Sequence, residues 1–276
     1  MGFHTQLARS WAAAGSSLCV GLDPDPDRHP VGIRGTAGAT ERFCRAIIDA
    51  TADLACAFKP QIAYFASQGE EATLERICSY IRSDYPDVTL ILDAKRGDIG
   101  STAEHYAREA FARYAAHAVT VNPYLGTDSI EPFFTSAANT DDAGVILLCR
   151  TSNPGGDDLQ SIVSSTEHGA KPLYVHVAEK AAADWSQLGQ IGLVVGATYP
   201  TELAEVRTIV GDLPLLVPGV GAQGGDPATV REHGSSSDGR GLIVNSSRAI
   251  LYASGDADFA EAARTEAERT AAALPC

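Results

Sequence analysis

Four charged side chains, Asp93, Lys95, Arg96 and Asp98, lie within six positions directly after the largely apolar run at residues 88–92. A run of this kind predicts a strand that is buried on both faces of a parallel sheet. Side chains two positions apart on a strand share a face, so we expect Asp93 and Lys95 to project together and Arg96 to turn aside. A carboxylate and an ammonium group held side by side with little water indicate a site for acid–base or electrostatic chemistry.

The residues after these charges predict a turn and then a helix. Gly97 permits a sharp turn, and Ser101 and Glu104 have the spacing of a capping box for a helix over residues 102–116. Asp98 adds a second carboxylate beyond the turn. An isolated Asp-x-Lys is more often a surface ion pair, but its position at the end of a buried strand favours a functional site.

Strand and helix patterns alternate along almost the whole chain, which is typical of βα units around a parallel sheet. Eight strands are predicted, at residues 17–22, 55–60, 88–93, 118–122, 144–149, 191–196, 213–217 and 241–245. Helices are predicted near residues 40–54, 66–83, 102–116, 127–138, 171–188, 200–210, 226–233 and 257–272. Eight repeats in about 250 residues predict an α/β fold, with a single (β/α)8 TIM barrel domain over residues 1–276. A leading helix at residues 4–14 would close the N-terminal end of the barrel.

An open, doubly wound sheet is the structural alternative, because periodicity alone does not show closure. Nearly every predicted strand ends in a polar or turn residue, and in a barrel these ends form one ring around one mouth, where such enzymes place their active sites. This distribution favours the barrel. Two βα connections are long, at residues 24–39 and 151–171. The first is expected to be a surface insertion, and the second, which begins with Thr151 and Ser152, is expected to act as a lid.

The loop at residues 219–224 matches G-x-G-x-x-G after the predicted seventh strand. Its place late in the chain argues against a dinucleotide fold, and Asp226 and Pro227 provide the cap and first-turn proline of a short helix. A glycine loop that leads into a helix N-terminus binds anions, and the loops after strands seven and eight of such barrels frequently bind phosphate. Arg248, in the turn after the eighth strand, would supply a bidentate cation to that phosphate.

The composition is that of an ordinary globular protein, with 276 residues of which 45% are hydrophobic and 20% are charged. A net charge of −14 at pH 7 argues against nucleic acid or an anionic membrane as a partner. No apolar run approaches the length of a membrane span, and the N-terminal region does not resemble a signal peptide. The six cysteines include no C-x-x-C pair and the seven histidines no H-E-x-x-H, so we expect a cytoplasmic protein with reduced cysteines and no zinc.

Five short motifs lie at the ends of predicted strands: Gly21-Leu22-Asp23-Pro24, Phe58-Lys59-Pro60, Asp93-x-Lys95-x-x-Asp98-Ile99-Gly100-x-Thr102, Ser152-Asn153-Pro154-Gly155 and Pro218-Gly219-Val220-Gly221. Together, and in this order, they resemble the motifs of the orotidine 5'-monophosphate decarboxylase family. The resemblance covers residues 21–251. It implies decarboxylation of orotidine 5'-phosphate to uridine 5'-monophosphate (UMP) without a cofactor, the last step of pyrimidine-nucleotide synthesis. It also implies a homodimer of barrels with active sites at the interface. The turn at residues 245–248, where many members have a Gly-Arg pair, indicates a divergent bacterial branch.

The resemblance implies a role for each matched residue. Lys95 would protonate C6 as carbon dioxide leaves, and Asp93 and Asp98 would flank the substrate carboxylate, with Asp98 coming from the partner subunit. Lys59 would complete the alternating chain of charges and contact the ribose. The other matched residues are expected to bind the substrate: Asp23 at the ribose, Thr102 near the ribose of the neighbouring site, Ser152 at the pyrimidine, Gln223 and Arg248 at the phosphate, and Pro218 as a further contact.

The chemistry of the reaction is consistent with these roles. Loss of carbon dioxide from C6 leaves a carbanion in the ring plane with no simple electron sink, so a preorganised ammonium group is an effective stabiliser. Binding energy from the distant phosphate can hold the substrate carboxylate beside the aspartates. Two other classes stay open, a metal-dependent sugar-phosphate decarboxylase or aldolase of similar barrel design and a non-enzymatic UMP-binding sensor. The complete set of lysines and aspartates argues against the sensor, because a sensor needs no proton donor.

Overall fold

The computed structural model describes residues 1–136, 138–166, 169–220 and 224–276. Within these residues, a closed parallel barrel is formed by β1 (Leu18–Leu22), β2 (Ala57–Pro60), β3 (Thr89–Arg96), β4 (Ala118–Val121), β5 (Gly144–Arg150), β8 (Ile191–Val195), β9 (Leu215–Pro218) and β10 (Leu242–Ser246). Strand β1 pairs with both β2 and β10, which closes the sheet and excludes the open, doubly wound alternative. The prediction of a TIM barrel is therefore confirmed.

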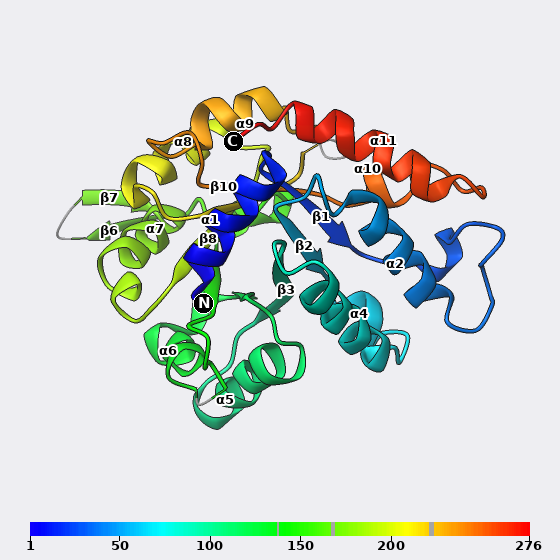
Figure 1. Cartoon of the computed structure of the whole chain (residues 1–276). Helices are drawn as coiled ribbons and strands as arrows, with labels where there is room; N and C mark the ends of the chain where they lie inside the picture. Colours follow the sequence, from blue (N-terminus) through cyan, green and yellow to red (C-terminus); the bar gives the residue numbers. More distant parts are fainter. Residues whose placement is uncertain (137, 167–168, 221–223) are drawn as a thin grey trace.

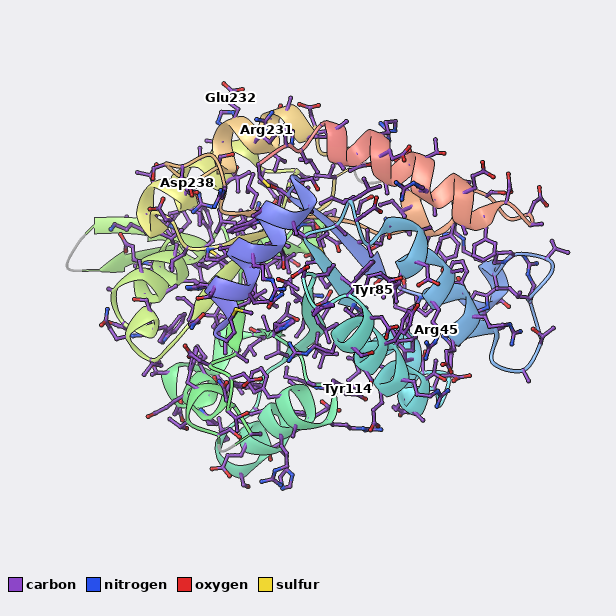
Figure 2. The ribbon with its side chains drawn as sticks, in the orientation of Figure 1. Arg45, Tyr85, Tyr114, Arg231, Glu232 and Asp238 are labelled. Atoms are coloured by element: carbon purple, nitrogen blue, oxygen red, sulfur yellow. The ribbon has the colours of Figure 1, made fainter. Side chains whose placement is uncertain are left out.

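Helices cover the outside of this barrel (Figure 1). They are α2 (Ala39–Thr51), α3 (Ile62–Ala66), α4 (Glu71–Asp84), α5 (Gly100–Arg108), α6 (Thr127–Thr135), α7 (Leu173–Ala183), α8 (Pro200–Val210), α9 (Pro227–Gly234), α10 (Arg248–Leu251) and α11 (Phe259–Ala272). Their apolar side chains pack on the strands, as Phe43 and Ile47 of α2 do, whereas Arg231 and Glu232 of α9 project outwards (Figure 2). No helix in the described ranges is long and apolar enough to cross a membrane.

Helix α1 (Phe3–Ala14) covers the N-terminal end of the barrel and crosses the strands in Figure 1. Its Phe3, Leu7 and Trp11 pack on a second apolar cluster that includes Ile91 of β3 and Ile146 of β5. The indole Nε1 of Trp11 donates a hydrogen bond to the carbonyl oxygen of Leu242, the first residue of β10, at 2.8 Å. Because this end is filled, the carboxyl ends of the strands form the end that remains for a binding site.

Two bulges lie near that end of the barrel. The pairing of β3 with β4 shifts register between Leu92 and Arg96, and the pairing of β5 with β8 shifts between Leu148 and Arg150. A bulge bends its strand and redirects the side chains that follow. The structure therefore departs from regular strand geometry at two of the strand ends that carry charged residues, those of β3 and β5.

Three segments differ from the predicted pattern. The helix expected at residues 66–83 begins later, as α4 at Glu71, and the separate short helix α3 (Ile62–Ala66) precedes it. The long connection after β5 contains an antiparallel hairpin of β6 (Val163–Thr166) and β7 (Gly169–Pro172), whose polar sequence carries no apolar alternation. Helix α5 begins at Gly100 and not at residue 102, so the predicted capping box of Ser101 and Glu104 is wrong: both residues lie inside the first turns of the helix.

Candidate active site

A cavity of about 520 Å³ opens at the carboxyl end of the barrel. It brings together seven of the predicted site residues, Asp23, Lys59, Asp93, Lys95, Ser152, Pro218 and Arg248. Asp98 and Thr102 do not line it, and Gln223 lies outside the described residues. The polar residues predicted at the strand ends therefore surround one cavity, as expected for a barrel.

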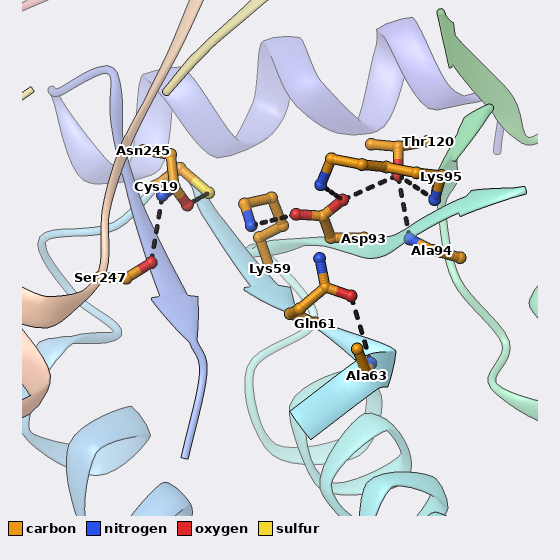
Figure 3. A network of polar contacts seen from close by, with 10 residues as sticks. All are labelled: Cys19, Lys59, Gln61, Ala63, Asp93, Ala94, Lys95, Thr120, Asn245 and Ser247. Atoms are coloured by element: carbon orange, nitrogen blue, oxygen red, sulfur yellow. Dashed lines mark hydrogen bonds and ion pairs between the residues drawn. The ribbon is translucent and has the colours of Figure 1, made fainter. Parts of the chain in front are cut away.

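Two lysines bind opposite oxygens of one buried carboxylate in this cavity (Figure 3). Lys59 Nζ at the end of β2 donates to Asp93 Oδ2 at 2.7 Å, and Lys95 Nζ donates to Asp93 Oδ1 at 2.6 Å. The side chains of Lys59 and Asp93 are only 5% and 8% exposed, whereas that of Lys95 is 45% exposed. Lys95 is therefore the lysine whose ammonium group a ligand in the cavity can reach.

The backbone of Lys95 has a left-handed conformation, with φ of 47°, which a lysine rarely adopts. The hydroxyl group of Thr120 on the adjacent strand β4 supports it by accepting hydrogen bonds from the amides of Ala94 and Lys95, both at 2.9 Å. The same hydroxyl donates to Asp93 Oδ1 at 2.9 Å. The bulge of β3 thus loses ladder bonds but leaves neither amide unpaired, and it turns Lys95 towards Asp93.

The buried charges keep one another ionised. Burial raises the pKa of the Asp93 carboxyl group, but the positive charges of Lys59 and Lys95 outweigh burial and hold that pKa well below its usual value of 3.8. Burial lowers the pKa of Lys59, but the negative charges of Asp93 and Asp23 outweigh it and raise that pKa above 10.5. Asp93 is therefore an anion at neutral pH and Lys59 a cation. Asp93 has no proton to give, so proton donation falls to an ammonium group.

Asp23 follows β1 at the edge of the cavity and has one carboxylate oxygen, Oδ1, that is buried without a hydrogen-bond partner among the described residues. Its backbone is fixed from the other end of the chain, because the hydroxyl group of Tyr252 donates to the carbonyl oxygen of Asp23 at 2.9 Å. The same hydroxyl accepts from the amide of Asp25 at 2.7 Å. A buried acceptor that is held in place but unsatisfied is suited to a hydroxyl group of a ligand.

The ends of β9 and β10 form another wall of the cavity, which includes Pro218, Gly219 and Arg248. Gly219 has φ of 100°, a conformation that favours glycine, so the chain turns sharply there. Asp226 caps α9 by accepting from the amide of Thr229 at 2.8 Å, as the sequence predicted. Arg248 is exposed and is the first residue of the short helix α10, where the sequence predicted a turn.

Asp98 lies beyond the β3 bulge, in the turn between β3 and α5, and Thr102 is exposed in the first turn of α5. Asp98 Oδ1 accepts a hydrogen bond from the amide of Ile99 at 2.8 Å, next to the start of α5. The structure therefore does not bring these two residues to the cavity of their own chain. Three large apolar side chains are exposed in this turn and in the one after β4, those of Ile99, Tyr124 and Leu125.

Residues 16–264 match the model of the orotidine 5'-phosphate decarboxylase / HUMPS family. The chain belongs to this family. Two relatives, the orotidine 5'-phosphate decarboxylases of Ralstonia pickettii and Cupriavidus necator, are 62% and 58% identical to this chain over 271 and 270 residues. These matches cover 98% of this chain in both cases, and 97% and 96% of the relatives. The solved OMP decarboxylase of Leishmania donovani is 37% identical with a TM-score of 0.82, covering 99% of this chain and 98% of that one.

Two further residues in or beside the cavity, Thr120 and Gln61, were not assigned a role from the sequence. Thr120 is a buried polar residue in the otherwise apolar strand β4, and this pattern could have indicated a role for it. Gln61 lines the cavity, lies opposite Asp93 in an isolated bridge and caps α3 through its side-chain oxygen (Figure 3). In the described ranges, no group of three or more His, Cys, Asp or Glu side chains is placed to hold a metal ion.

Proposed function

We propose that this protein is a cytoplasmic decarboxylase that converts orotidine 5'-monophosphate to UMP and carbon dioxide in pyrimidine-nucleotide synthesis. The observation that carries the proposal is the Lys59–Asp93–Lys95 array, in which two ammonium groups share one buried carboxylate at a cavity. The names of relatives that match over nearly their whole length support the same activity.

In the proposed reaction, the substrate carboxylate lies near Asp93, and the bond between C6 and that carboxylate breaks. Carbon dioxide leaves, and the electron pair stays on C6. The ammonium group of Lys95 stabilises the developing negative charge and gives its proton to C6, and Lys95 then regains a proton from water. Lys95 has this role, and not Lys59, because its side chain is 45% exposed and that of Lys59 is 5% exposed.

The substrate's other groups have matching partners around the cavity. The unpaired Oδ1 of Asp23 would accept from a ribose hydroxyl group, and Ser152 would contact the pyrimidine. Arg248 would bind the phosphate, and Pro218 would be a further contact of the substrate in the cavity. The family resemblance adds Gln223, which lies outside the described residues, to the phosphate contacts. The phosphate contact lies away from C6, so its binding energy can be used to hold the reacting carboxylate in place.

We also propose that a second copy of the chain completes the site. Asp98 and Thr102 lie outside the cavity of their own chain, and the exposed apolar side chains of Ile99, Tyr124 and Leu125 lie in the same turn and the next one. A patch of exposed apolar side chains is typical of a protein interface. Burying it in a two-fold symmetric dimer would place Asp98 and Thr102 near the partner's substrate.

The proposal is tested by adding orotidine 5'-monophosphate to the purified protein in the presence of EDTA and following the loss of substrate absorbance. Rapid conversion to UMP that EDTA does not affect is the expected result. Activity that EDTA abolishes and Mg²⁺ restores would favour the metal-dependent sugar-phosphate enzyme instead. UMP binding without turnover would favour the sensor.

A further inference from the structure

Arg150, the last residue of β5, has a charged side chain that is only 2% exposed. Its partners do not fully compensate for this burial, because Nε has no hydrogen-bond partner in the part of the chain that the structure describes and the pairing carboxylate, that of Asp157, is itself 58% exposed. A well-packed apolar side chain often stabilises a fold as much as a buried ion pair does. Stability alone is therefore a weak reason for an arginine at this position.

The contacts of the guanidinium group join the end of β5 to the loop that follows it. One terminal nitrogen donates to Asp157 Oδ1 at 2.6 Å, and the other donates to Gln160 Oε1 at 3.4 Å. The ring of Tyr199, which precedes α8, lies 3.7 Å from the guanidinium carbon. Arg150 thus contacts two points of the loop and the next βα connection at the same time.

Gln160 also forms hydrogen bonds with Thr151, the first residue of the loop. Its Oε1 accepts from the amide of Thr151 at 2.8 Å, and its Nε2 donates to the hydroxyl group of Thr151 at 2.8 Å. The hydroxyl group of Thr151 in turn donates to Asn153 Oδ1 at 2.7 Å. The two residues on either side of Ser152 are therefore tied, through Gln160, to the guanidinium group of Arg150.

Two glycines show how closely these parts approach one another. A Cβ atom on Gly156 would lie 3.0 Å from a guanidinium nitrogen of Arg150, so the loop passes directly over that group. A Cβ atom on Gly196, after β8, would lie 2.8 Å from the Cα of Ser152. The amide of Gly196 also donates to the carbonyl oxygen of Arg150 at 2.7 Å. Ser152 is thus confined from the side of β8 as well as by its own loop.

We propose that Arg150 is a positioning residue that presets the loop at residues 151–160 so that Ser152 faces the pyrimidine of the substrate. The inference rests on the proposed function, because it needs a pyrimidine nucleotide in the cavity. Arg150 does not itself line the cavity. It acts through Gln160, Thr151 and the backbone, so its loss changes recognition of the base while it leaves the phosphate site unchanged.

The test compares the binding of UMP with that of ribose 5-phosphate, which lacks the base, by titration calorimetry. Arg150→Met removes the hydrogen bonds but keeps an unbranched apolar side chain. UMP affinity is expected to fall about tenfold, and that of ribose 5-phosphate to stay within about twofold. Arg207→Met is the matched control, because Arg207 is also buried but its hydrogen bonds within the described ranges go to backbone carbonyl oxygens, including those of Gly234 and Gly241. It is expected to lower stability without changing the ratio of the two affinities.

A double-mutant cycle separates positioning from a general effect on the fold. In a Ser152→Ala background, Arg150→Met is expected to cause a much smaller further loss of UMP affinity, because both changes remove the same contact. Fully additive losses, or equal losses for UMP and ribose 5-phosphate, would overturn the inference. If Arg150→Met does not fold, Asp157→Ala at the exposed end of the pair gives the same test, with an expected loss of about threefold for UMP alone. A wild-type protein that does not prefer UMP to ribose 5-phosphate would instead count against the proposed function.

Discussion

The hydroxyl group of Thr120 donates a hydrogen bond to Oδ1 of Asp93, 2.9 Å away, and thereby joins β4 to the charged centre. Because that hydroxyl also accepts from two amides of the β3 bulge, one small side chain holds both the carboxylate and the backbone of Lys95. The array of charges thus depends on a residue that carries no charge itself.

Thr120→Val keeps the shape of the side chain and removes its hydroxyl group. Two amides and one carboxylate oxygen lose a partner, so we expect the free energy of unfolding to fall by about 1–3 kcal/mol and kcat to fall about tenfold or more. Urea unfolding and steady-state kinetics measure the two effects. Thr120→Ser, which keeps the hydroxyl group, should recover most of the activity. Equal kcat values for the valine and serine variants would show that the hydroxyl group has no part in positioning Lys95.

The sequence predicts the structure best where burial determines the pattern of apolar and polar residues. The strands of the barrel are buried runs, so their positions and their polar ends could be predicted, and Asp93, Lys95 and Lys59 follow from them. The bulge of β3 could not, because it depends on Thr120 of a neighbouring strand and not on local residues. Gly97 was expected to make the turn by its flexibility, but the positive φ belongs to Lys95 and Gly100. At Gly97 a side chain would instead crowd Asn122, with Cβ at 3.3 Å from its backbone oxygen.

Arg248→Ala should weaken binding of phosphate-bearing ligands specifically. If its guanidinium group forms two charge-assisted hydrogen bonds with the phosphate, kcat/KM should fall about a hundredfold. Affinity for UMP should fall by a similar factor, whereas affinity for uridine, which lacks the phosphate, should change little. Arg231→Ala, on the exposed face of α9, is the control and should leave both affinities unchanged. Parallel losses for UMP and uridine would place the phosphate elsewhere.

His117 is expected to make the fold sensitive to mild acid. Burial, and then the charge of Arg82, lower its pKa from 6.5 to about 3, while its Nδ1 accepts from the amide of Leu90 at 2.8 Å. Below pH 6.5 His117 is therefore protonated in the unfolded chain, whereas in the folded chain it stays neutral down to about pH 3. The stability of the fold falls as the pH drops through this window. The loss due to His117 should be about 2 kcal/mol at pH 5.

The measurement is urea unfolding between pH 7.5 and pH 5 for the wild type and for His117→Asn. The asparagine side chain can still accept from the Leu90 amide but does not titrate, so its stability should depend less on pH than that of the wild type. Identical pH dependence in the two proteins would mean that His117 is not the group responsible.

The shared site is tested by mixing two inactive variants, Lys95→Ala and Asp98→Ala, and refolding them together. If Asp98 acts across the interface, each mixed dimer has one doubly defective site and one intact site. Random pairing makes half of the dimers mixed, so activity should recover to about a quarter of the wild-type value. If Asp98 acts in its own chain, every site keeps one lesion. No recovery, with mixed dimers confirmed by mass, would reject the shared site.

Proton donation to C6 by the ammonium group of Lys95 is tested by measuring turnover of orotidine 5'-monophosphate by Lys95→Ala together with the affinity of this variant for UMP. We expect kcat to fall about a thousandfold or more, with UMP affinity within about tenfold of the wild type, because the phosphate site is intact. Lys180→Ala, which removes a surface lysine paired with Asp184, should turn over normally. Near-normal turnover by Lys95→Ala would show that Lys95 is not the proton donor.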